Sequence, residues 1–230
     1  WMMYLKALIC DWAIKEDDFL NDLNKLTELG CGNDIISPFT ALSMEDRPDR
    51  HKIRSENYAK SLAIPEHTML FPKTDSKQSR TTIAYFSLFL PSDPVFNLIQ
   101  KVFRLHDRKR FRVTAYLLTN SLPFDHLKKL HELFDKVTPV ENLSDSEVAA
   151  LSRKHGVDIA VDLLGYTRGG RTGIFSHRAA PIQINFLGYP GTSGAEFFDY
   201  IVADKNLISE KNQKFYSEKI IFLPNSYQPN

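Results

Sequence analysis

Residues 156–194 read GVDIAVDLLGYTRGGRTGIFSHRAAPIQINFLGYPGTSG, and this stretch decides the fold. Eight of the chain's ten glycines lie in it. Two apolar runs that read as buried strands, Asp158–Leu163 and Ile182–Leu187, lead into the Gly-Tyr pairs Gly165-Tyr166 and Gly188-Tyr189. A buried strand that opens into a glycine-rich turn is typical of the carboxyl edge of an open α/β sheet, where ligands bind. Because glycine lets a ligand approach the backbone closely, the two turns predict one ligand site.

Polar and basic side chains are interleaved with these glycines. They are Thr167, Arg168, Arg171 and Arg178. With the N–H groups of the turns, they favour a polar or anionic ligand such as a phosphate or a sugar. In this interpretation Tyr189 and Pro190 form a flat apolar wall of a sugar pocket. The alternative for residues 165–171 is a long turn with solvated arginines, and for residues 187–194 it is a tight structural turn.

Strands and helices alternate around this stretch. The predicted strands are Thr82–Ser87, Phe111–Leu118, Val137–Val140, Asp158–Leu163, Ile182–Leu187, Tyr200–Ala203 and Lys219–Leu223. The predicted helices are Pro94–Leu105, Phe124–Phe134, Asp145–His155 and a turn of helix at Ile174–Arg178. Such alternation predicts a parallel sheet with helices on both faces. The fold class is therefore α/β, a Rossmann-like domain over residues 80–230.

The first part of the chain has a different pattern, because its apolar residues recur at helical spacing without strand alternation. Helices are predicted at residues 15–29, from Ser37-Pro38 onward, and at Pro48–Ile64. The face of the last one that is expected to point inward consists of Ile53, Tyr58, Leu62 and Ala63. We therefore expect a small helical appendage over residues 1–72, joined to the main domain by a polar linker over residues 72–80.

Composition excludes several classes of protein. The chain has 230 residues, 43% hydrophobic and 25% charged, with a net charge of +1, so no overall field favours nucleic acid or a membrane surface. No apolar run reaches the ~18–20 residues that a membrane helix needs, and the N-terminal run lacks the features of a signal peptide. Two cysteines, Cys10 and Cys31, are too few for a disulfide framework and indicate a reducing, cytoplasmic location. Trp at position 1 and an end close after a strand-like run indicate a fragment.

Other kinds of site find no support. Seven histidines are scattered along the chain, and His126 and His131 lack the i, i+4 spacing of a helix-borne metal pair, so no metal is expected. The absence of a G-x-S-x-G motif leaves acyl hydrolysis unsupported. The basic run Arg104–Arg110 reads as a solvated loop, so no nucleic-acid partner is expected.

The first strand-to-helix turn, residues 87–94, reads SLFLPSDP. It lacks the G-x-G-x-x-G pattern of dinucleotide-binding proteins. Asp93 stands just before Pro94, a favoured first helical residue, so it is a candidate helix cap. Asp93 is equally a candidate general base that faces the ligand crevice, and the two roles are not exclusive.

Several long motifs resemble one enzyme family. They are VDLLGYTRGGRTGIFSHRAAPIQINFLGYPGTSG at residues 161–194, FDYIVAD at 198–204, FYSEKIIFLPNSYQPN at 215–230 and SPFTALSMEDRPDRHKIRSENYA at 37–59. Together they resemble the N-terminal half of the catalytic region in the O-GlcNAc transferase and SPINDLY-like glycosyltransferases. The resemblance extends over nearly the whole chain and is densest at residues 158–199 and 216–230.

The resemblance implies a two-domain enzyme of the GT-B type that transfers N-acetylglucosamine from UDP-GlcNAc to Ser or Thr hydroxyls of protein acceptors. It implies inversion at the sugar, no metal, a nucleotide-binding domain after this chain and tetratricopeptide repeats before it. Motif positions that border the sugar and the acceptor are Thr167, Arg171, Leu187, Gly188, Tyr189 and Pro190. Positions that support these loops are Gly165, Tyr166 and Gly191.

One loop departs from the family pattern. Where family members carry a segment like SSDFRNHP, this chain has SLFLPSDP, so Phe89 replaces the motif's Asp and Asp93 replaces its His. With a reference pKa of roughly 3.9, aspartate is a weaker base than histidine near neutral pH. The enzyme therefore uses another acceptor geometry, or its activity is weakened or lost. The alternatives to N-acetylglucosamine transfer are a non-catalytic scaffold that keeps the fold and an O-fucosyltransferase that uses GDP-fucose.

Overall fold

The computed structural model describes residues 28–42, 45–62 and 80–229, and its centre is a parallel seven-stranded sheet. The strands are β1 (Thr81–Ser87), β2 (Phe111–Leu117), β3 (Lys136–Pro139), β4 (Ile159–Asp162), β5 (Ile182–Asn185), β6 (Tyr200–Ala203) and β7 (Lys219–Phe222). Their order is β3-β2-β1-β4-β5-β6-β7, and every neighbouring pair is parallel. The predicted α/β class is confirmed, and all seven predicted strands are present. This order reverses between β1 and β4, which is where doubly wound sheets open a ligand crevice.

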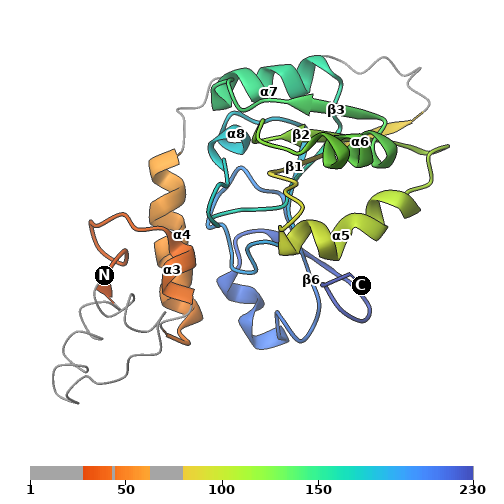
Figure 1. Ribbon diagram of the computed structural model, residues 1–230. Helices are drawn as coiled ribbons and strands as arrows, with labels where there is room; N and C mark the ends of the chain where they lie inside the picture. The colour runs from red at the N-terminus through yellow and green to blue at the C-terminus, as the bar shows by residue number, and fades with distance from the viewer. Residues whose placement is uncertain (1–27, 43–44, 63–79, 230) are drawn as a thin grey trace, which may run out of the picture.

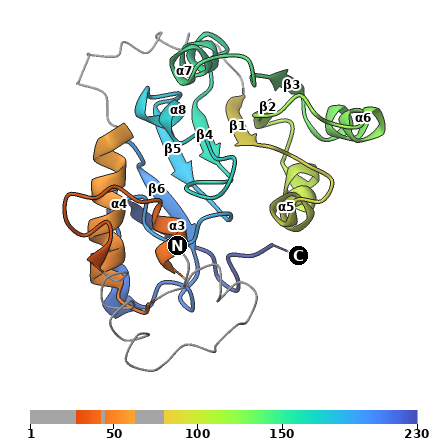
Figure 2. The same cartoon turned by 60° about the vertical axis from the view of Figure 1, so that its left-hand side comes forward.

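Helices cover both faces of the sheet (Figures 1 and 2). They are α3 (Pro38–Leu42), α4 (Pro48–Leu62), α5 (Pro94–Leu105), α6 (Phe124–Leu133), α7 (Asp145–Lys154), α8 (Gly173–Ser176) and the 3-10 helix η1 (Glu210–Phe215). Helices α5 and α6 share one apolar core with the strands, and α4, α7 and α8 share the other. The helix starts follow the predicted signals: Asp93 caps α5, and Ser144 with Glu147 forms a capping box at α7. The sequence pattern did not reveal η1.

Helix α4 packs directly on the main domain, beside β5 and β6 in Figure 2. A Cβ atom at Gly194 would collide with the backbone of Ser55 and Glu56, and Gly194 has φ +64. Only glycine accepts both this contact and this conformation without strain, so Gly194 allows the backbone of α4 to pack directly against the second glycine-rich turn. Ala59 extends the contact into the core that α7 and α8 share.

The inward face of α4 matches the prediction only in part. Tyr58, predicted inward, packs edge-on against Tyr166 with the ring centres 4.8 Å apart. Ile53, also predicted inward, is 40% exposed, whereas Arg54, Ser55 and Ala59 are buried. The pattern of apolar residues does not reveal this face, because a charged residue, Arg54, is buried in it. The partner of that charge lies outside the helix. Ala63 and Ile64, the predicted helix up to residue 27 and the linker up to residue 79 lie outside the described residues.

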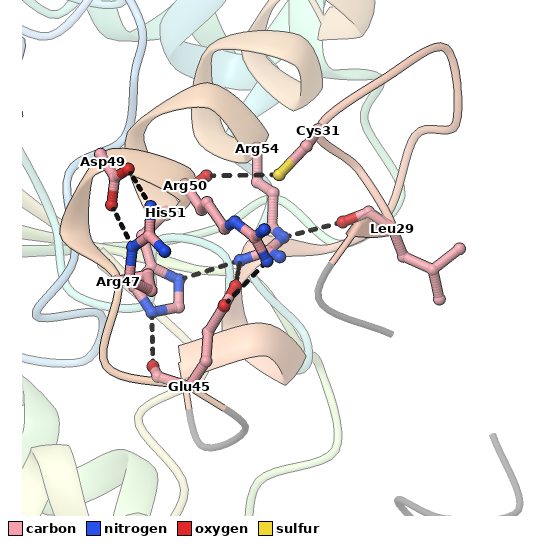
Figure 3. A network of polar contacts seen from close by, with 8 residues as sticks. All are labelled: Leu29, Cys31, Glu45, Arg47, Asp49, Arg50, His51 and Arg54. Atoms are coloured by element: carbon pink, nitrogen blue, oxygen red, sulfur yellow. Dashed lines mark hydrogen bonds and ion pairs between the residues drawn. The ribbon is translucent and has the colours of Figure 1, made fainter. Parts of the chain in front are cut away.

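Arg54 is buried inside a network of polar contacts that holds α4 to the segment before it (Figure 3). Its side chain is 1% exposed, its Nη1 lies 2.5 Å from Glu45 Oε1, and its Nε donates to the Leu29 carbonyl. His51 Nε2 contacts the Glu45 carbonyl oxygen at 2.9 Å. Because a buried arginine is tolerated only when it is paired and hydrogen-bonded, Glu45 and the Leu29 carbonyl account for the burial of Arg54. Within the described ranges, no helix is long and apolar enough to cross a membrane.

Candidate active site

Three loops meet at the carboxyl edge of the sheet: the first loop (residues 88–93), the first glycine turn (163–172) and the second glycine turn (186–194). A Cβ atom at Gly169 would lie 2.8 Å from Leu88 Cδ1, so the first glycine turn touches the first loop. A Cβ atom at Gly165 would lie 2.6 Å from Tyr189 Cβ, so the two glycine turns touch each other. The sheet thus brings together the three segments that the sequence analysis singled out.

Asp162, the last residue of β4, organises the first glycine turn. Its Oδ1 accepts hydrogen bonds from the N–H groups of Leu164 at 2.9 Å and Gly165 at 3.0 Å. Burial raises the pKa of Asp162 to about 6, and the two N–H groups act in the opposite direction. Thr167 closes the turn, because its hydroxyl donates to the Leu164 carbonyl at 2.8 Å. The turn is therefore fixed by its own hydrogen bonds before any ligand is present.

The arginines of this region differ in what they contact. Arg171 donates through Nε to Asp145 Oδ1, through Nη1 to the Val140 carbonyl and through Nη2 to the Leu143 carbonyl. Arg178 likewise donates to Asp199 and to two backbone carbonyls. These guanidinium groups hold neighbouring segments of the protein. Two of the three arginines that were predicted to meet an anionic ligand therefore bind groups of the protein instead. Arg168, in contrast, is exposed on the first glycine turn.

Asn185, the last residue of β5, organises the second glycine turn. Its Nδ2 donates to the Tyr189 carbonyl at 3.2 Å and to the Gly191 carbonyl at 3.5 Å. The Pro190 carbonyl accepts a hydrogen bond from the Tyr216 hydroxyl at 3.1 Å. Leu187 has φ 79 and is buried. The turn is therefore bound on both sides, and Gly188, Pro190 and Gly194 are its half-buried members.

The two tyrosines lie together inside the protein. The rings of Tyr166 and Tyr189 are 5.2 Å apart, and the Tyr166 hydroxyl donates to the Ser193 carbonyl at 2.7 Å. The Tyr189 ring is 1% exposed, and its hydroxyl contacts Ser55 Oγ of α4 at 3.4 Å. The expectation that this ring forms an open wall of a sugar pocket is wrong, because Gly165 leaves room for the ring to fold under the turn. The ring supports the second glycine turn from within.

Glu218 is a buried carboxyl that sequence reasoning missed. It is 5% exposed, and it accepts hydrogen bonds from Thr192 Oγ1 at 2.7 Å and from the Ser193 N–H at 2.6 Å. Burial and the Glu218 carboxyl together raise the pKa of the nearby Tyr216 to about 12. Glu218 thus ties the end of the second glycine turn to the start of β7. Its place in the SEK tripeptide beside β7 carries no signal of this contact.

Phe89 gives the first loop its character. The residue is fully buried, and its ring packs against Phe96, Phe103 and Phe134 in the core under α5 and α6. Its φ of 52 lies in the left-handed region, which costs a residue with a side chain about 1–2 kcal/mol. The burial of a large aromatic side chain offsets this cost. The loop is therefore held by apolar packing, where the glycine turns are held by polar contacts.

Asp93 is the N-cap of α5, as one of its two predicted roles required. Its Oδ1 accepts from the Val95 N–H at 2.9 Å, and the residue has the extended backbone of a cap. Burial raises the pKa of Asp93, against the effect of the N–H groups of Val95 and Phe96. Oδ2 is buried, and within the described residues no hydrogen-bond partner reaches it. A capping carboxyl with one unused oxygen keeps the role of general base open.

His126 is a second candidate that sequence reasoning missed, because it was judged only as half of a metal pair. It extends from α6 to the first loop, where its Nε2 donates to the Phe89 carbonyl oxygen at 2.7 Å. Its ring packs edge-on against Phe96 at 4.9 Å. In the neutral imidazole this bond leaves the lone pair on Nδ1, which can accept a proton. Among the described residues no group of three His, Cys, Asp or Glu side chains could hold a metal.

The comparison with family models matches residues 49–228 to "Glycosyl transferase family 41". The matched segment contains all of α4 but its first residue, the whole sheet and all three loops of the carboxyl edge. A probable UDP-N-acetylglucosamine–peptide N-acetylglucosaminyltransferase SEC from Arabidopsis thaliana is 30% identical over 158 residues, which are 69% of this chain and 16% of that protein. A UDP-N-acetylglucosamine–peptide N-acetylglucosaminyltransferase from Caenorhabditis elegans is 28% identical over 96% of this chain and 20% of its own length. The chain thus spans about a fifth of these relatives.

A solved structure gives the same picture of the fold. It is a K341M mutant of the Thermobaculum terrenum O-GlcNAc transferase, and it superimposes with a TM-score of 0.74 at 26% sequence identity. The alignment covers 84% of this chain and 38% of the solved chain. The likeness therefore extends over most of the fold of this chain.

Proposed function

The chain belongs to glycosyl transferase family 41, and from that membership we propose that its carboxyl edge is one side of the active site of a protein O-glycosyltransferase. The proposed reaction moves N-acetylglucosamine from UDP-GlcNAc to Ser or Thr hydroxyls of protein acceptors, with inversion at the sugar. The observation that carries the proposal is the family match over the three loops that meet at this edge. The names of the relatives in Arabidopsis and Caenorhabditis support the donor.

The chemistry sets what this edge would have to do. The acceptor hydroxyl must lose a proton as it attacks, while negative charge builds on the leaving diphosphate. We assign proton removal to the first loop, with Asp93 as the family-aligned candidate and His126 as the candidate that the geometry adds. We assign the leaving group to the nucleotide-binding domain that the family implies, outside these 230 residues.

The glycine turns would position the reactants mainly through their backbones. Thr167, Leu187, Gly188 and Pro190 are the proposed ligand-bordering residues, because they lie on the turns that meet the first loop. Tyr189 and Arg171 act on the site through packing and hydrogen bonds, as their buried contacts favour. Gly165, Tyr166 and Gly191 support the same turns from below.

The remaining features of the intact protein are proposals of the same kind. We expect a helical part over residues 1–72, a Rossmann-like domain over residues 80–230, and a further nucleotide-binding domain together with tetratricopeptide repeats in the full-length protein. We also expect a cytoplasmic enzyme that needs no metal and has protein acceptors as partners. The match to only 38% of the solved O-GlcNAc transferase chain supports the additional domains.

One observation favours a second candidate function, a scaffold that binds proteins without turnover. Phe89, at the motif's Asp position, is fully buried in an aromatic cluster, so it offers no polar group to a substrate. A chain that keeps the polar glycine turns while filling its first loop with core residues is what loss of catalysis would leave.

The test is sugar transfer by the full-length protein from labelled UDP-GlcNAc, with GDP-fucose as a parallel donor, to an acceptor mixture rich in Ser and Thr. We expect transfer from UDP-GlcNAc by the wild type. We expect its loss in Asp93→Ala and in His126→Ala, because each substitution removes a candidate proton acceptor. Transfer from GDP-fucose alone would replace the proposed donor. A folded protein that transfers neither sugar would favour the scaffold.

Two matched controls separate chemistry from folding. Ser144→Ala removes the cap of α7, another helix that starts at the same edge, and so costs similar stability without touching the first loop. His131→Ala removes an exposed histidine one and a half turns along the helix that carries His126. Transfer should survive both controls.

A further inference from the structure

Two buried side-chain oxygens at the ends of the neighbouring strands β4 and β5 have no hydrogen-bond partner within the described residues. They are Oδ2 of Asp162, at the end of β4, and Oδ1 of Asn185, at the end of β5. Each residue is 1% exposed. An unpaired buried acceptor is destabilising, so two such atoms on neighbouring strand ends call for an explanation.

The sheet places the two residues side by side. Asp162 and Asn185 are register partners on adjacent parallel strands, so their side chains leave the same face of the sheet. Both also lie beside Gly165: its N–H donates to Asp162 Oδ1 at 3.0 Å, and a Cβ atom placed on it would lie 3.4 Å from Asn185 Oδ1. Two buried acceptors on paired strand ends are complementary only if one of them carries a proton.

The surroundings favour a proton on Asp162. The register neighbour on β1 is Phe86, which packs against Phe175 of α8, so this side is apolar. The ionisable groups that gather at this place from the two glycine turns, α4 and the segments around η1 are Tyr166, Tyr189, Tyr58, Tyr216 and Glu218. Arg54 is a cation in the same place: its charge lowers the pKa of Tyr189, and it is paired with Glu45. Among the described residues Asp162 has no basic partner, and burial with no counter-charge favours the neutral acid.

We propose that Asp162, as the neutral acid, donates its Oδ2 proton to Asn185 Oδ1 and thereby joins the two glycine turns. Asp162 Oδ1 already holds the N–H groups of Leu164 and Gly165, and Asn185 Nδ2 holds the carbonyls of Tyr189 and Gly191. The added bond makes one continuous chain of hydrogen bonds from the first turn to the second. Asp162 and Asn185 are therefore positioning residues, and their link opens when Asp162 loses its proton.

This inference does not depend on the sugar that is transferred. It predicts that the relative position of the two turns follows one titration, with a midpoint at or above about 6, the pKa that burial, opposed by the N–H groups of Gly165 and Leu164, gives Asp162. The bond to Asn185 stabilises the protonated form further, so removal of Asn185 Oδ1 must lower that midpoint.

The experiment measures the titration of Asp162 by carbon NMR of the labelled carboxyl groups, with the resonance assigned from its loss in Asp162→Asn. The amide signals of Gly165, Gly188 and Gly191 are followed in the same samples. We expect all four to titrate together at or above pH 6. Infrared spectra below that midpoint should contain the carbonyl band of a protonated carboxyl group, and Asp162→Asn should lack it.

Asp162→Asn also supplies a rescue. Its amide can donate to Asn185 Oδ1 at every pH while its oxygen still accepts from the first turn, so the glycine signals should stay near their low-pH positions. The wild type loses stability as Asp162 ionises, and this variant does not. The difference between their melting temperatures should therefore change by on the order of 5 °C in favour of the variant from pH 4 to pH 7. Asn185→Leu should lower the midpoint of Asp162; if that variant does not fold, the rescue by Asp162→Asn decides alone.

Asp204 is the matched control. It follows β6 as Asp162 ends β4, but its two oxygens accept from the N–H groups of Asn206, Leu207 and Tyr227, and these bonds lower its pKa. Asp204→Asn should leave the protonated carboxyl band and the glycine titration unchanged. The proposal is overturned if Asp162 titrates below pH 5, or if the glycine signals of Asp162→Asn still titrate as in the wild type.

Discussion

The first loop and the two glycine turns lie against one another at the same edge of the sheet, yet they are held by opposite means. Phe89 anchors the first loop inside an aromatic cluster, and Asp93 caps the helix that follows. The glycine turns are held by buried polar side chains, chiefly Asp162 and Asn185, and by α4 packed against Gly194. The two regions therefore respond differently to substitution.

The comparison separates what preserves the fold from what carries the chemistry. The glycine turns match the family motif, and their contacts are nearly all internal, so their sequence is explained by architecture. The first loop departs from the motif, and its apolar packing is equally internal, so its polarity cannot be restored by a single substitution. The proposed chemistry accordingly depends on the polar groups at the margin of the first loop, Asp93 and His126.

The largest effect is expected from Phe89→Asp, which would restore the residue type of the family motif. Placing a carboxylate in a fully buried aromatic cluster should cost more than about 4 kcal/mol in the free energy of unfolding. Chemical denaturation measures this cost. The same change at Phe124, which is 81% exposed, should shift stability by less than about 0.5 kcal/mol. Equal effects at the two positions would mean that the first loop is not held by its core.

A smaller but still large effect is expected from Gly194→Ala. The new Cβ would meet the backbone of α4 at a position with φ +64, so we expect a loss of about 3 kcal/mol. Hydrogen exchange should show faster opening of α4 while α5 is unaffected. Gly32 has nothing within 4 Å of its Cβ position, so Gly32→Ala is the control and should be nearly neutral. Normal protection of α4 in Gly194→Ala would contradict the proposed packing of α4 against Gly194.

Arg171→Met tests whether the arginine of the first glycine turn holds the protein or a ligand. Loss of its bonds to Asp145, Val140 and Leu143 should lower stability by about 2 kcal/mol, since the guanidinium is only partly buried. Arg168→Met, on the exposed part of the turn, should change stability by less than about 0.5 kcal/mol. Thermal melts of both variants make the comparison. A neutral Arg171→Met would return this residue to the candidate ligand contacts.

The smallest expected effect belongs to Asp93. Asp93→Ala removes the cap and should cost about 1 kcal/mol, whereas Asp93→Asn keeps it. Because burial raises the pKa of Asp93, the folded protein holds this proton more tightly than the unfolded chain does. The contribution of Asp93 to stability therefore falls as pH rises through its folded pKa, and Asp93→Asn should remove that fall. Melts of both variants from pH 4 to pH 8 test the sign.

Most of the fold was predictable because strand runs, capping residues and glycine turns are local signals. Ser144 and Glu147, for instance, announce the start of α7 by their spacing alone. The inward face of α4 was predicted only in part, because Arg54 becomes a core residue only through Glu45, which lies nine residues earlier and outside the helix. The hydrophobic pattern of a helix cannot indicate an ion-pair partner that lies outside that helix.

The site was predictable in place but not in detail. The meeting of the three loops follows from a parallel sheet, whose strand ends share an edge. The burial of Tyr189 and the internal use of Arg171 depend on how loops pack, which residue types do not reveal. The pairing of Asp162 with Asn185 depends on strand register, and His126 reaches the first loop from a different helix. These roles become visible only in three dimensions.

We propose above all that this edge forms one side of a sugar-transfer site. Its most direct test is the initial rate at which the full-length protein transfers labelled N-acetylglucosamine from UDP-GlcNAc to protein hydroxyls, compared with Thr167→Val and Pro190→Ala variants that remain folded at the assay temperature. The account predicts transfer by the wild type and at least about a tenfold loss in both variants, equivalent to ~1.4 kcal/mol of transition-state stabilisation. A folded wild type that transfers no sugar, or variants that transfer as fast as it does, would contradict the account.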